Sequence, residues 1–179
     1  MILTLSFESN AFSVAAMPLS RLVLLAFIAA IAAAIIRFVG YEVVNGAAEA
    51  IDGDSIRIGQ REIRLKGIDA PEYRQTCQGE RGEVACGRDA RAALVALLAR
   101  GSLRCDISGR DRYGRDLGHC FAGEVDVNAA MVKDGHAVAF GDFVFEEAAA
   151  RSARRGLWAT RFDPPSEWRR LHPRNGAGS

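Results

Sequence analysis

Apolar and polar residues alternate along two short stretches near the start of the globular part of the chain. In residues 55–58 and again in residues 62–65, isoleucine or leucine alternates with polar side chains, and a Gly-Gln pair separates the two stretches. A period of two places the apolar side chains on one face, so the pattern predicts a β-hairpin. Residues 103–107 and 117–121 predict a second hairpin with a long connection, and residues 137–140 predict a further strand.

Three later stretches carry the helical period. In residues 88–100 apolar positions recur at i, i+3, i+4, i+7 and i+8, and Gly101 follows as a stop signal. Residues 125–133 and 144–155 predict two further helices, each ended by a glycine. Strands first, then a helix, a hairpin and more helices predict an α+β domain with a small barrel or curled sheet.

A run of apolar residues from Leu22 to Ile36 precedes the globular part. The run is apolar on every side, so it does not predict an amphipathic core helix. It is shorter than the roughly 20 residues of a membrane-spanning helix and fits the apolar segment of an export signal, although residues beyond Arg37 extend it. We expect export, with the segment either cleaved or kept as an N-terminal membrane anchor, and the anchor is favoured. Met17 is an alternative start to Met1.

These patterns divide the chain into three parts. Residues 1–40 form an N-terminal extension with the signal or anchor segment, residues 41–163 the globular domain, and residues 164–179 a C-terminal tail expected to be loose. The length of 179 residues suffices for one domain plus an appendage, and hydrophobic residues at 49% can fill a core. A formal net charge of +1 excludes, for the whole chain, the strongly basic surface typical of a tight nucleic-acid binder.

Four carboxylates surround the first hairpin: Asp52 and Asp54 come just before it, and Asp69 and Glu72 come just after it. Asp54 and Asp69 lie at its two outer ends, so folding of the hairpin brings them together. Two neighbouring carboxylates need a cation, a shared proton or solvent between them. A cation held beside a carboxylate, together with Arg64 of the same hairpin, is a combination of groups that suits phosphate-ester chemistry. Asp52 is interpreted as support for this cluster, with a simple turn-forming role as the alternative.

Four motifs follow one another in the order IDGDS, IRLKGIDAPE, DRYGR and RRGLW. In this combination and at these spacings the chain resembles the staphylococcal nuclease (thermonuclease) family over roughly residues 48–158. The resemblance implies an OB-type five-stranded β-barrel with about three helices, in agreement with the α+β prediction. In this chain a hydrophobic helix is expected to precede the barrel.

The resemblance also implies roles for eight residues. It assigns Ca²⁺ ligation to Asp54, Asp69 and the backbone carbonyl of Ala70, the water-orienting base to Glu72, phosphate binding to Arg64 and Arg115, and the lining of the nucleotide site to Arg112 and Tyr113. Calcium prefers oxygen ligands, and fixed guanidiniums stabilise the charge that builds on a phosphoryl group during attack. Ala70 stands where the family has a threonine, and Phe140 lies about where the family can place a tyrosine, so each position lacks a hydroxyl.

The implied activity is calcium-dependent hydrolysis of phosphodiester bonds in DNA and RNA outside the cytoplasm. Single-stranded substrates are favoured because an open barrel face suits splayed strands. Two alternatives stay open: a nucleic-acid-binding module of the same fold without turnover, and an accessory role in envelope or polysaccharide biogenesis. The intact set of acids and arginines argues against the first alternative. Nothing in the sequence indicates a sugar site or a protein partner.

Salt bridges offer a competing interpretation of the two phosphate-binding arginines. Arg64 can pair with Glu62 or another surface acid, and Arg115 can pair with Asp111 or Asp116. The motif matches favour the catalytic interpretation of both.

The four cysteines are Cys77, Cys86, Cys105 and Cys120, an even number that lies beyond the export segment. Cys105 and Cys120 fall on opposite arms of the second hairpin, and Cys77 and Cys86 enclose one loop. We therefore predict these two disulfides, although three connectivities are formally available. The competing zinc site lacks a C-x-x-C motif and a spaced histidine pair.

Overall fold

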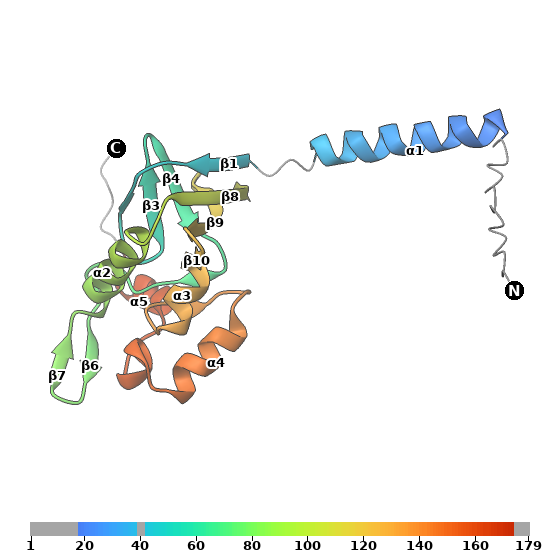
Figure 1. Ribbon diagram of the computed structural model, residues 1–179. Coiled ribbons are helices and arrows are strands. Elements are labelled where there is room, and N and C mark those ends of the chain that lie inside the picture. Colours follow the sequence, from blue (N-terminus) through green and yellow to red (C-terminus); the bar gives the residue numbers. More distant parts are fainter. Residues whose placement is uncertain (1–17, 39–41, 174–179) are drawn as a thin grey trace, which may run out of the picture. The chain divides into compact units, whose positions relative to one another are not determined.

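The computed structural model describes residues 18–38 and 42–173. The chain folds as two separate units, Met1–Gly40 and Tyr41–Ser179. In the first unit, residues Leu19–Phe38 form helix α1 (Figure 1). None of the helices in the described ranges combines the length and the apolar character needed to cross a membrane.

The second unit is built around one sheet of seven strands. These strands are β1 (Glu42–Asn45), β2 (Ala48–Ala50), β3 (Ser55–Ile58), β4 (Arg61–Leu65), β8 (Leu103–Arg110), β9 (Asp116–Ala122) and β10 (Val125–Asp126). Their order is β1-β8-β9-β4-β3-β2, with β10 added to β9 (Figure 1). Strands β4 and β9 run parallel, and the other neighbours run antiparallel.

The two strands at the ends of this order, β1 and β2, are halves of one bent segment, because only Gly46 and Ala47 separate them. One half pairs with β8 and the other with β3, so the order of strands returns to the segment where it began. Closure of this kind leaves no long unpaired sheet edge, as in small barrels. With β1 and β2 counted together and β10 as a short addition, five strand segments make up the closed order.

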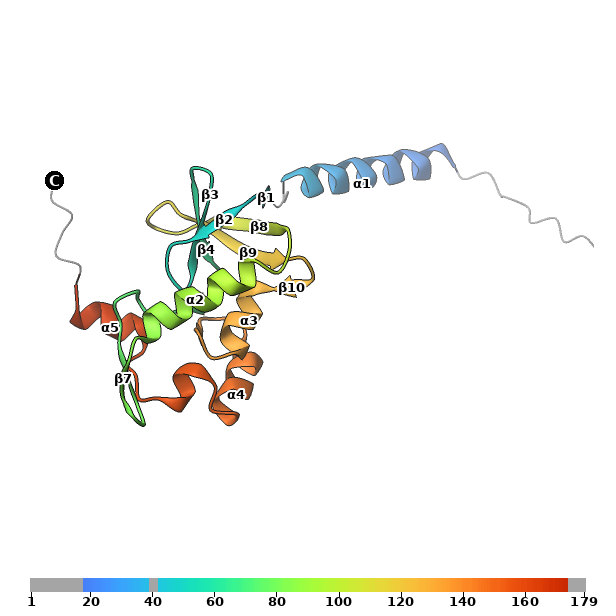
Figure 2. The same cartoon turned by 60° about the vertical axis from the view of Figure 1, so that its left-hand side comes forward.

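Within residues 42–173, four helices accompany the sheet. They are α2 (Cys86–Leu98), α3 (Val127–Lys133), α4 (Val144–Ser152) and α5 (Pro165–Leu171), with the 3₁₀ turn η1 (Gly156–Ala159) before α5. Two short strand pairs complete the unit: β5 (Ile68–Asp69) with β11 (Val138–Ala139), and β6 (Cys77–Gly79) with β7 (Gly82–Val84). Helix α3 contacts both α2 and α4 (Figure 2).

The predicted mixture of strands and helices is confirmed, with two corrections. The helix expected at 125–133 begins at Val127 instead, because Asp126 and its neighbour first pair with β9. Asp126 Oδ1 then accepts a hydrogen bond from the Ala129 amide at 2.9 Å and caps the helix. The stretch 164–179, expected to be a loose tail, contains α5.

The core lies between the sheet and helices α2 and α3. Ile56 and Ile63 of the hairpin β3–β4 are fully buried, and they share one apolar cluster with Leu94 of α2 and Met131 of α3. Burial of a side chain of this size contributes roughly 1.5–3 kcal/mol. The apolar face of the hairpin is therefore fixed to the core, and the residues at its ends are held with it.

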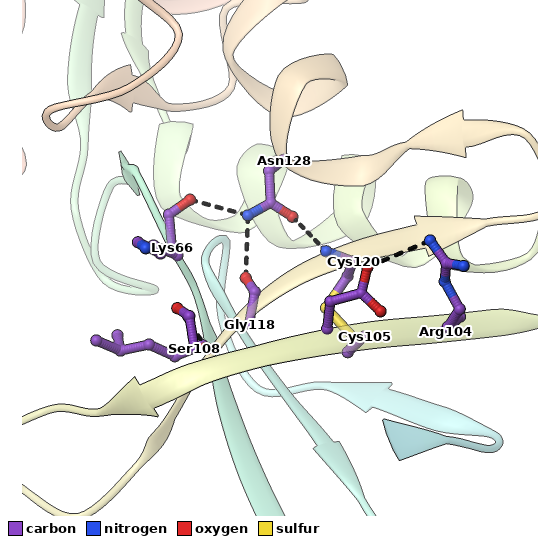
Figure 3. Close-up of a disulfide and its surroundings, with 9 residues drawn as sticks. Lys66, Arg104, Cys105, Ser108, Gly118, Cys120 and Asn128 are labelled. Atoms are coloured by element: carbon purple, nitrogen blue, oxygen red, sulfur yellow. Dashed lines mark hydrogen bonds and ion pairs between the residues drawn. A yellow bond between two sulfur atoms is a disulfide. The ribbon is translucent and has the colours of Figure 1, made fainter. Parts of the chain in front are cut away.

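Both predicted disulfides are present, Cys77–Cys86 and Cys105–Cys120. Cys105 and Cys120 lie directly opposite each other on β8 and β9, with Cα atoms 4.1 Å apart. Next to this bond, the fully buried Asn128 accepts a hydrogen bond from the Cys120 amide at 3.0 Å (Figure 3). Its amide nitrogen donates to the Lys66 carbonyl at 2.9 Å, so α3 is tied to the end of β4 as well.

Candidate active site

Asp54 and Asp69 reach the same place from the two ends of the hairpin β3–β4. Asp54 immediately precedes β3, Asp69 ends β5, and each is 3% exposed. Asp54 Oδ2 accepts a hydrogen bond from the Ala70 amide, and Asp54 Oδ1 accepts one from Ser55 Oγ, both at 3.1 Å. The approach of the two acids that the hairpin predicted is therefore present.

The turn before β3 sets the position of Asp54. Asp52 Oδ1 accepts a hydrogen bond from the Asp54 amide at 3.1 Å, which is the turn-forming role considered for Asp52. A Cβ on Gly53 would lie 2.7 Å from the Cβ of Ala70 and 2.8 Å from that of Ala90. Glycine is needed here because the turn packs directly against α2 and against residue 70.

Arg64 joins the two acids. Its Nη2 lies 2.9 Å from Asp54 Oδ2 and 2.8 Å from Asp69 Oδ1, and its Nη1 lies 3.2 Å from Asp54 Oδ1. One nitrogen thus contacts both carboxylates, so the pair lies within reach of a single cation. The alternative that Arg64 pairs with Glu62 does not match the structure, because in the described part of the chain the ion pairs of Arg64 are with Asp54 and Asp69.

Burial raises the pKa of Asp54 to about 7. The guanidinium of Arg64 lowers this pKa and the neighbouring carboxylate of Asp52 raises it, but the loss of water dominates. With this pKa the carboxyl group is about half protonated at pH 7, and a bound cation favours its ionised form.

The donor set of the acid pair fits a hard cation. It consists of two carboxylates and, beside them, the backbone of Ala70, whose amide already contacts Asp54. Within the described residues no group of three or more His, Cys, Asp or Glu side chains is arranged to hold a metal ion. Carboxylate and carbonyl oxygens are the donors that hard ions such as Ca²⁺ or Mg²⁺ prefer.

A further arginine, Arg169 of α5, lies at this pair of acids. Its Nη1 is 3.0 Å from Asp69 Oδ1 and 3.0 Å from Glu72 Oε1, and its Nη2 is 3.0 Å from Asp69 Oδ2. Partial burial by itself lowers the pKa of Arg169, but the two carboxylates outweigh this and raise the pKa above its usual value. Sequence reasoning missed Arg169 because it assigned residues 164–179 to a loose tail.

A buried glutamine connects α5 to the segment that carries Glu72. Gln75 is 1% exposed, its Nε2 donates to the Asp163 carbonyl at 2.8 Å, and its Oε1 accepts from the Glu72 amide at 3.2 Å. Pro165, the first residue of α5, is also fully buried. Proline at the start of a helix was the one signal for α5 in the sequence, and it says nothing about where the helix packs.

Arg115 lies in the connection between β8 and β9. Burial by itself lowers the pKa of Arg115, but nearby carboxylates, that of Asp54 among them, outweigh this and raise the pKa. Its Nε donates to Asp111 Oδ2 at 2.8 Å, and its Nη1 lies 3.7 Å from Glu62 Oε1. The salt bridge to Asp111 that competed with a catalytic role is present. In the same connection, the guanidinium of Arg112 stacks over the ring of Tyr113 at 4.8 Å, and Tyr113 is 69% exposed.

One cavity of about 1120 Å³ gathers most of these side chains. Its lining includes the sequence-predicted Arg64, Glu72, Arg112, Tyr113 and Arg115, and from α5 Trp168, Arg169 and His172. Asp54 and Asp69 are not part of the lining, since both are buried beneath Arg64 and Arg169. A larger hollow of about 1580 Å³ is lined by residues of β2, α2 and the β8–β9 region and contains none of the predicted site residues.

The match to a family model agrees with this geometry. The model for staphylococcal nuclease homologues matches residues 62–160. The chain belongs to this family, as its four motifs predicted. Arg64, Asp69, Glu72 and Arg115 lie inside the matched residues, whereas Asp54 precedes them and α5 follows them.

Individual relatives carry different names. The chain is 39% identical over 125 residues to the succinoglycan biosynthesis protein ExoI of Rhizobium meliloti, covering 65% of each chain. It is 32% identical over 129 residues to an uncharacterized endonuclease of Escherichia coli, covering 66% of this chain and 78% of the relative. It is 30% identical over 138 residues to the probable staphylococcal-like nuclease CAN2 of Oryza sativa, covering 73% of this chain and 34% of the relative. The chain thus spans slightly less than two thirds of ExoI and about a third of the rice protein.

Proposed function

We propose that this chain is a metal-dependent nuclease that hydrolyses phosphodiester bonds of DNA and RNA. One observation carries the proposal: two buried carboxylates share a guanidinium nitrogen at the edge of a cavity lined by arginines. Carboxylates bind a cation, and guanidiniums bind the oxygens of a phosphate, so the cavity has the two kinds of group that phosphoryl transfer needs.

Asp54, Asp69 and the carbonyl of Ala70 are the groups that would hold the cation, and we propose calcium. When bound, such an ion neutralises charge on the phosphate and polarises a water molecule. Glu72 lines the cavity and can accept a proton from the attacking water. Negative charge then builds on the phosphoryl oxygens. Arg64, which contacts both acids, and Arg115, which lies between β8 and β9, stabilise this charge.

The proposed substrate is a single strand. The ring of Tyr113 is exposed at the cavity, and exposed aromatic rings provide stacking surfaces for unpaired bases. Arg112, stacked on this ring, adds a cation beside the path of the strand. The salt bridge of Arg115 to Asp111 holds its guanidinium in a defined orientation until a phosphate arrives.

We propose that the enzyme acts outside the cytoplasm, either anchored through the N-terminal segment or released by cleavage. The two disulfides support this proposal, because such bonds persist in oxidising compartments. The apolar run that includes residues 22–36 supports it as well.

The likeness to ExoI favours one alternative, an accessory role in polysaccharide biogenesis, since that relative is named for succinoglycan biosynthesis. A binding module without turnover is the second alternative. Both predict a chain that does not need Glu72 for its activity. The roles of Glu72 and of calcium therefore separate the nuclease from both alternatives.

The test is a cleavage assay on labelled single- and double-stranded DNA and RNA, with calcium and with chelator. We expect calcium-dependent cleavage by the unaltered chain and a loss of about a hundredfold in Glu72→Gln. The matched control is Glu80→Gln, since Glu80 is an exposed acid that does not line the site cavity. Binding of nucleic acid without cleavage would identify a module, and the absence of both would favour the polysaccharide role.

A further inference from the structure

Helix α5 places the guanidinium of Arg169 at the site where the proposed metal ion would bind. Both oxygens of the Asp69 carboxylate are engaged by Arg169, Oδ1 by its Nη1 and Oδ2 by its Nη2, each at 3.0 Å. The same Nη1 contacts Glu72 Oε1 at 3.0 Å. Asp69 Oδ1 is also 2.8 Å from Arg64. The oxygens of Asp69 that could bind a metal are thus the oxygens that bind guanidinium.

Charge makes the two occupants incompatible. Two guanidiniums, those of Arg64 and Arg169, already contact the carboxylates here, and both of them contact Asp69. A divalent cation added to this arrangement would place a third positive group within a few ångströms of two others, where like charges repel. Removal of Arg169 from Asp69 frees Oδ2 from this guanidinium, leaves Oδ1 in contact with Arg64, and restores negative charge at the carboxylate.

Arg169 can leave without disrupting the core. Its side chain is 39% exposed, whereas those of Asp69 and Arg64 are 4% and 20% exposed. Exposed ion pairs are weakened by water, so this contact is more easily exchanged than the one made by Arg64. Helix α5 itself is held by Pro165 and by the hydrogen bond from Gln75 to Asp163, so the guanidinium stays close after it is released.

We propose that Arg169 competes with a divalent metal ion for the cation-binding site at Asp69 and Glu72. This competition sets the affinity of the site for the metal. The inference deepens the proposed function and rests on it. Residue 169 lies outside the part of the chain that matches the family model, so the family likeness assigns it no role.

The test measures calcium binding by titration calorimetry on the full chain. Arg169→Gln is expected to bind calcium roughly tenfold more tightly, because a coupling of this kind usually changes affinity by about 5- to 150-fold. The control is Arg170→Gln, since Arg170 is the next residue of α5, is 70% exposed and pairs with Glu167. This control should bind calcium within about twofold of the unaltered chain. In the unaltered chain, calcium should also speed amide hydrogen exchange in residues 165–171.

The outcomes separate this inference from the proposed function. Equal or weaker binding by Arg169→Gln, with binding abolished in Asp54→Asn, would overturn the inference and leave the metal site standing. Tighter binding by Arg169→Gln without any cleavage would support the inference and overturn the nuclease. The absence of binding in every variant would overturn both. If Arg169→Gln does not fold, amide hydrogen exchange in the unaltered chain still tests the inference. Exchange rates in α5 that do not change when calcium is added would overturn it.

Discussion

The floor and the edge of the cavity are built in different ways. The floor, defined here as Asp54, Asp69 and Arg64, comes from one hairpin and its ends, is mostly buried and is fixed to the core by the apolar face of that hairpin. The edge, defined as α5 with Arg169, comes from the far end of the chain and keeps its arginine partly exposed. Both regions present guanidiniums to the same carboxylate, that of Asp69.

The difference teaches that two similar contacts can have opposite effects on activity. Arg64 is mostly buried and is held by two buried carboxylates, and preorganised cations of this kind stabilise a transition state. Arg169 occupies ligand oxygens and has to move, so the same chemical group acts against metal binding. Removal of the floor arginine should therefore reduce activity, and removal of the edge arginine should increase it when calcium is scarce.

The largest effect is expected at the floor. Arg64→Ala should reduce the rate of single-strand cleavage by at least about a hundredfold, because it removes a fixed cation from the charge that builds on phosphate. The rate under saturating calcium is the measurement. Arg57→Ala, an exposed arginine on the neighbouring strand β3, should keep the full rate. Comparable rates in the two variants would contradict the role of the floor.

A second prediction compares the two disulfides. Loss of Cys105–Cys120 in the double alanine variant should lower the free energy of unfolding by about 2–4 kcal/mol, because the bond joins the central strands β8 and β9. Loss of Cys77–Cys86 should act on the edge instead, since the neighbouring Gln78 exchanges backbone hydrogen bonds with Arg161 shortly before α5.

Urea denaturation measures the first effect, and hydrogen exchange in α5 measures the second. An equal loss of global stability in both double variants, with α5 exchange unchanged, would show that the cavity edge does not depend on the second bond. Double serine variants of the same cysteine pairs are the matched controls, because they test the effect of side-chain polarity.

The connection between floor and edge can be weakened at one residue. Gln75→Ala removes the hydrogen bond from Gln75 to Asp163 and the one from the Glu72 amide to Gln75, at a cost of about 1–3 kcal/mol each. We expect faster exchange in α5 and calcium affinity raised severalfold, in the same direction as Arg169→Gln. Calorimetry checks the affinity, and unchanged binding would mean that α5 is held by other contacts.

The smallest effect is expected from pH. The pKa of Asp54 is raised to about 7 by burial, so below pH 7 a proton has to leave before a cation binds. Calcium affinity should fall by at most tenfold between pH 7 and pH 6, and it should change little above pH 8, where Asp54 is already ionised. Calorimetry in two buffers of different ionisation enthalpy counts the released protons. Binding without proton release at pH 6 would contradict the raised pKa.

Much of the floor could be predicted from the sequence alone. The alternation in 55–58 and 62–65 determined a hairpin with one buried face, and the acids at its ends had to meet once it formed. The pairing of Cys105 with Cys120 followed from their places on opposite arms of one hairpin. These features depend on contacts between residues close in the chain, where periodicity and turn chemistry decide the structure.

The edge was decided by the tertiary structure. Arg169 and Asp69 are 100 residues apart, and no local pattern relates them. The contact forms because the barrel closes, Gln75 and Pro165 fix the start of α5, and a half-exposed guanidinium then finds two carboxylates that the hairpin had already brought together. The sequence by itself thus determined which acids form the floor. Which arginines contact those acids was decided by packing between segments that are far apart in the sequence, because ion pairs depend on proximity in space.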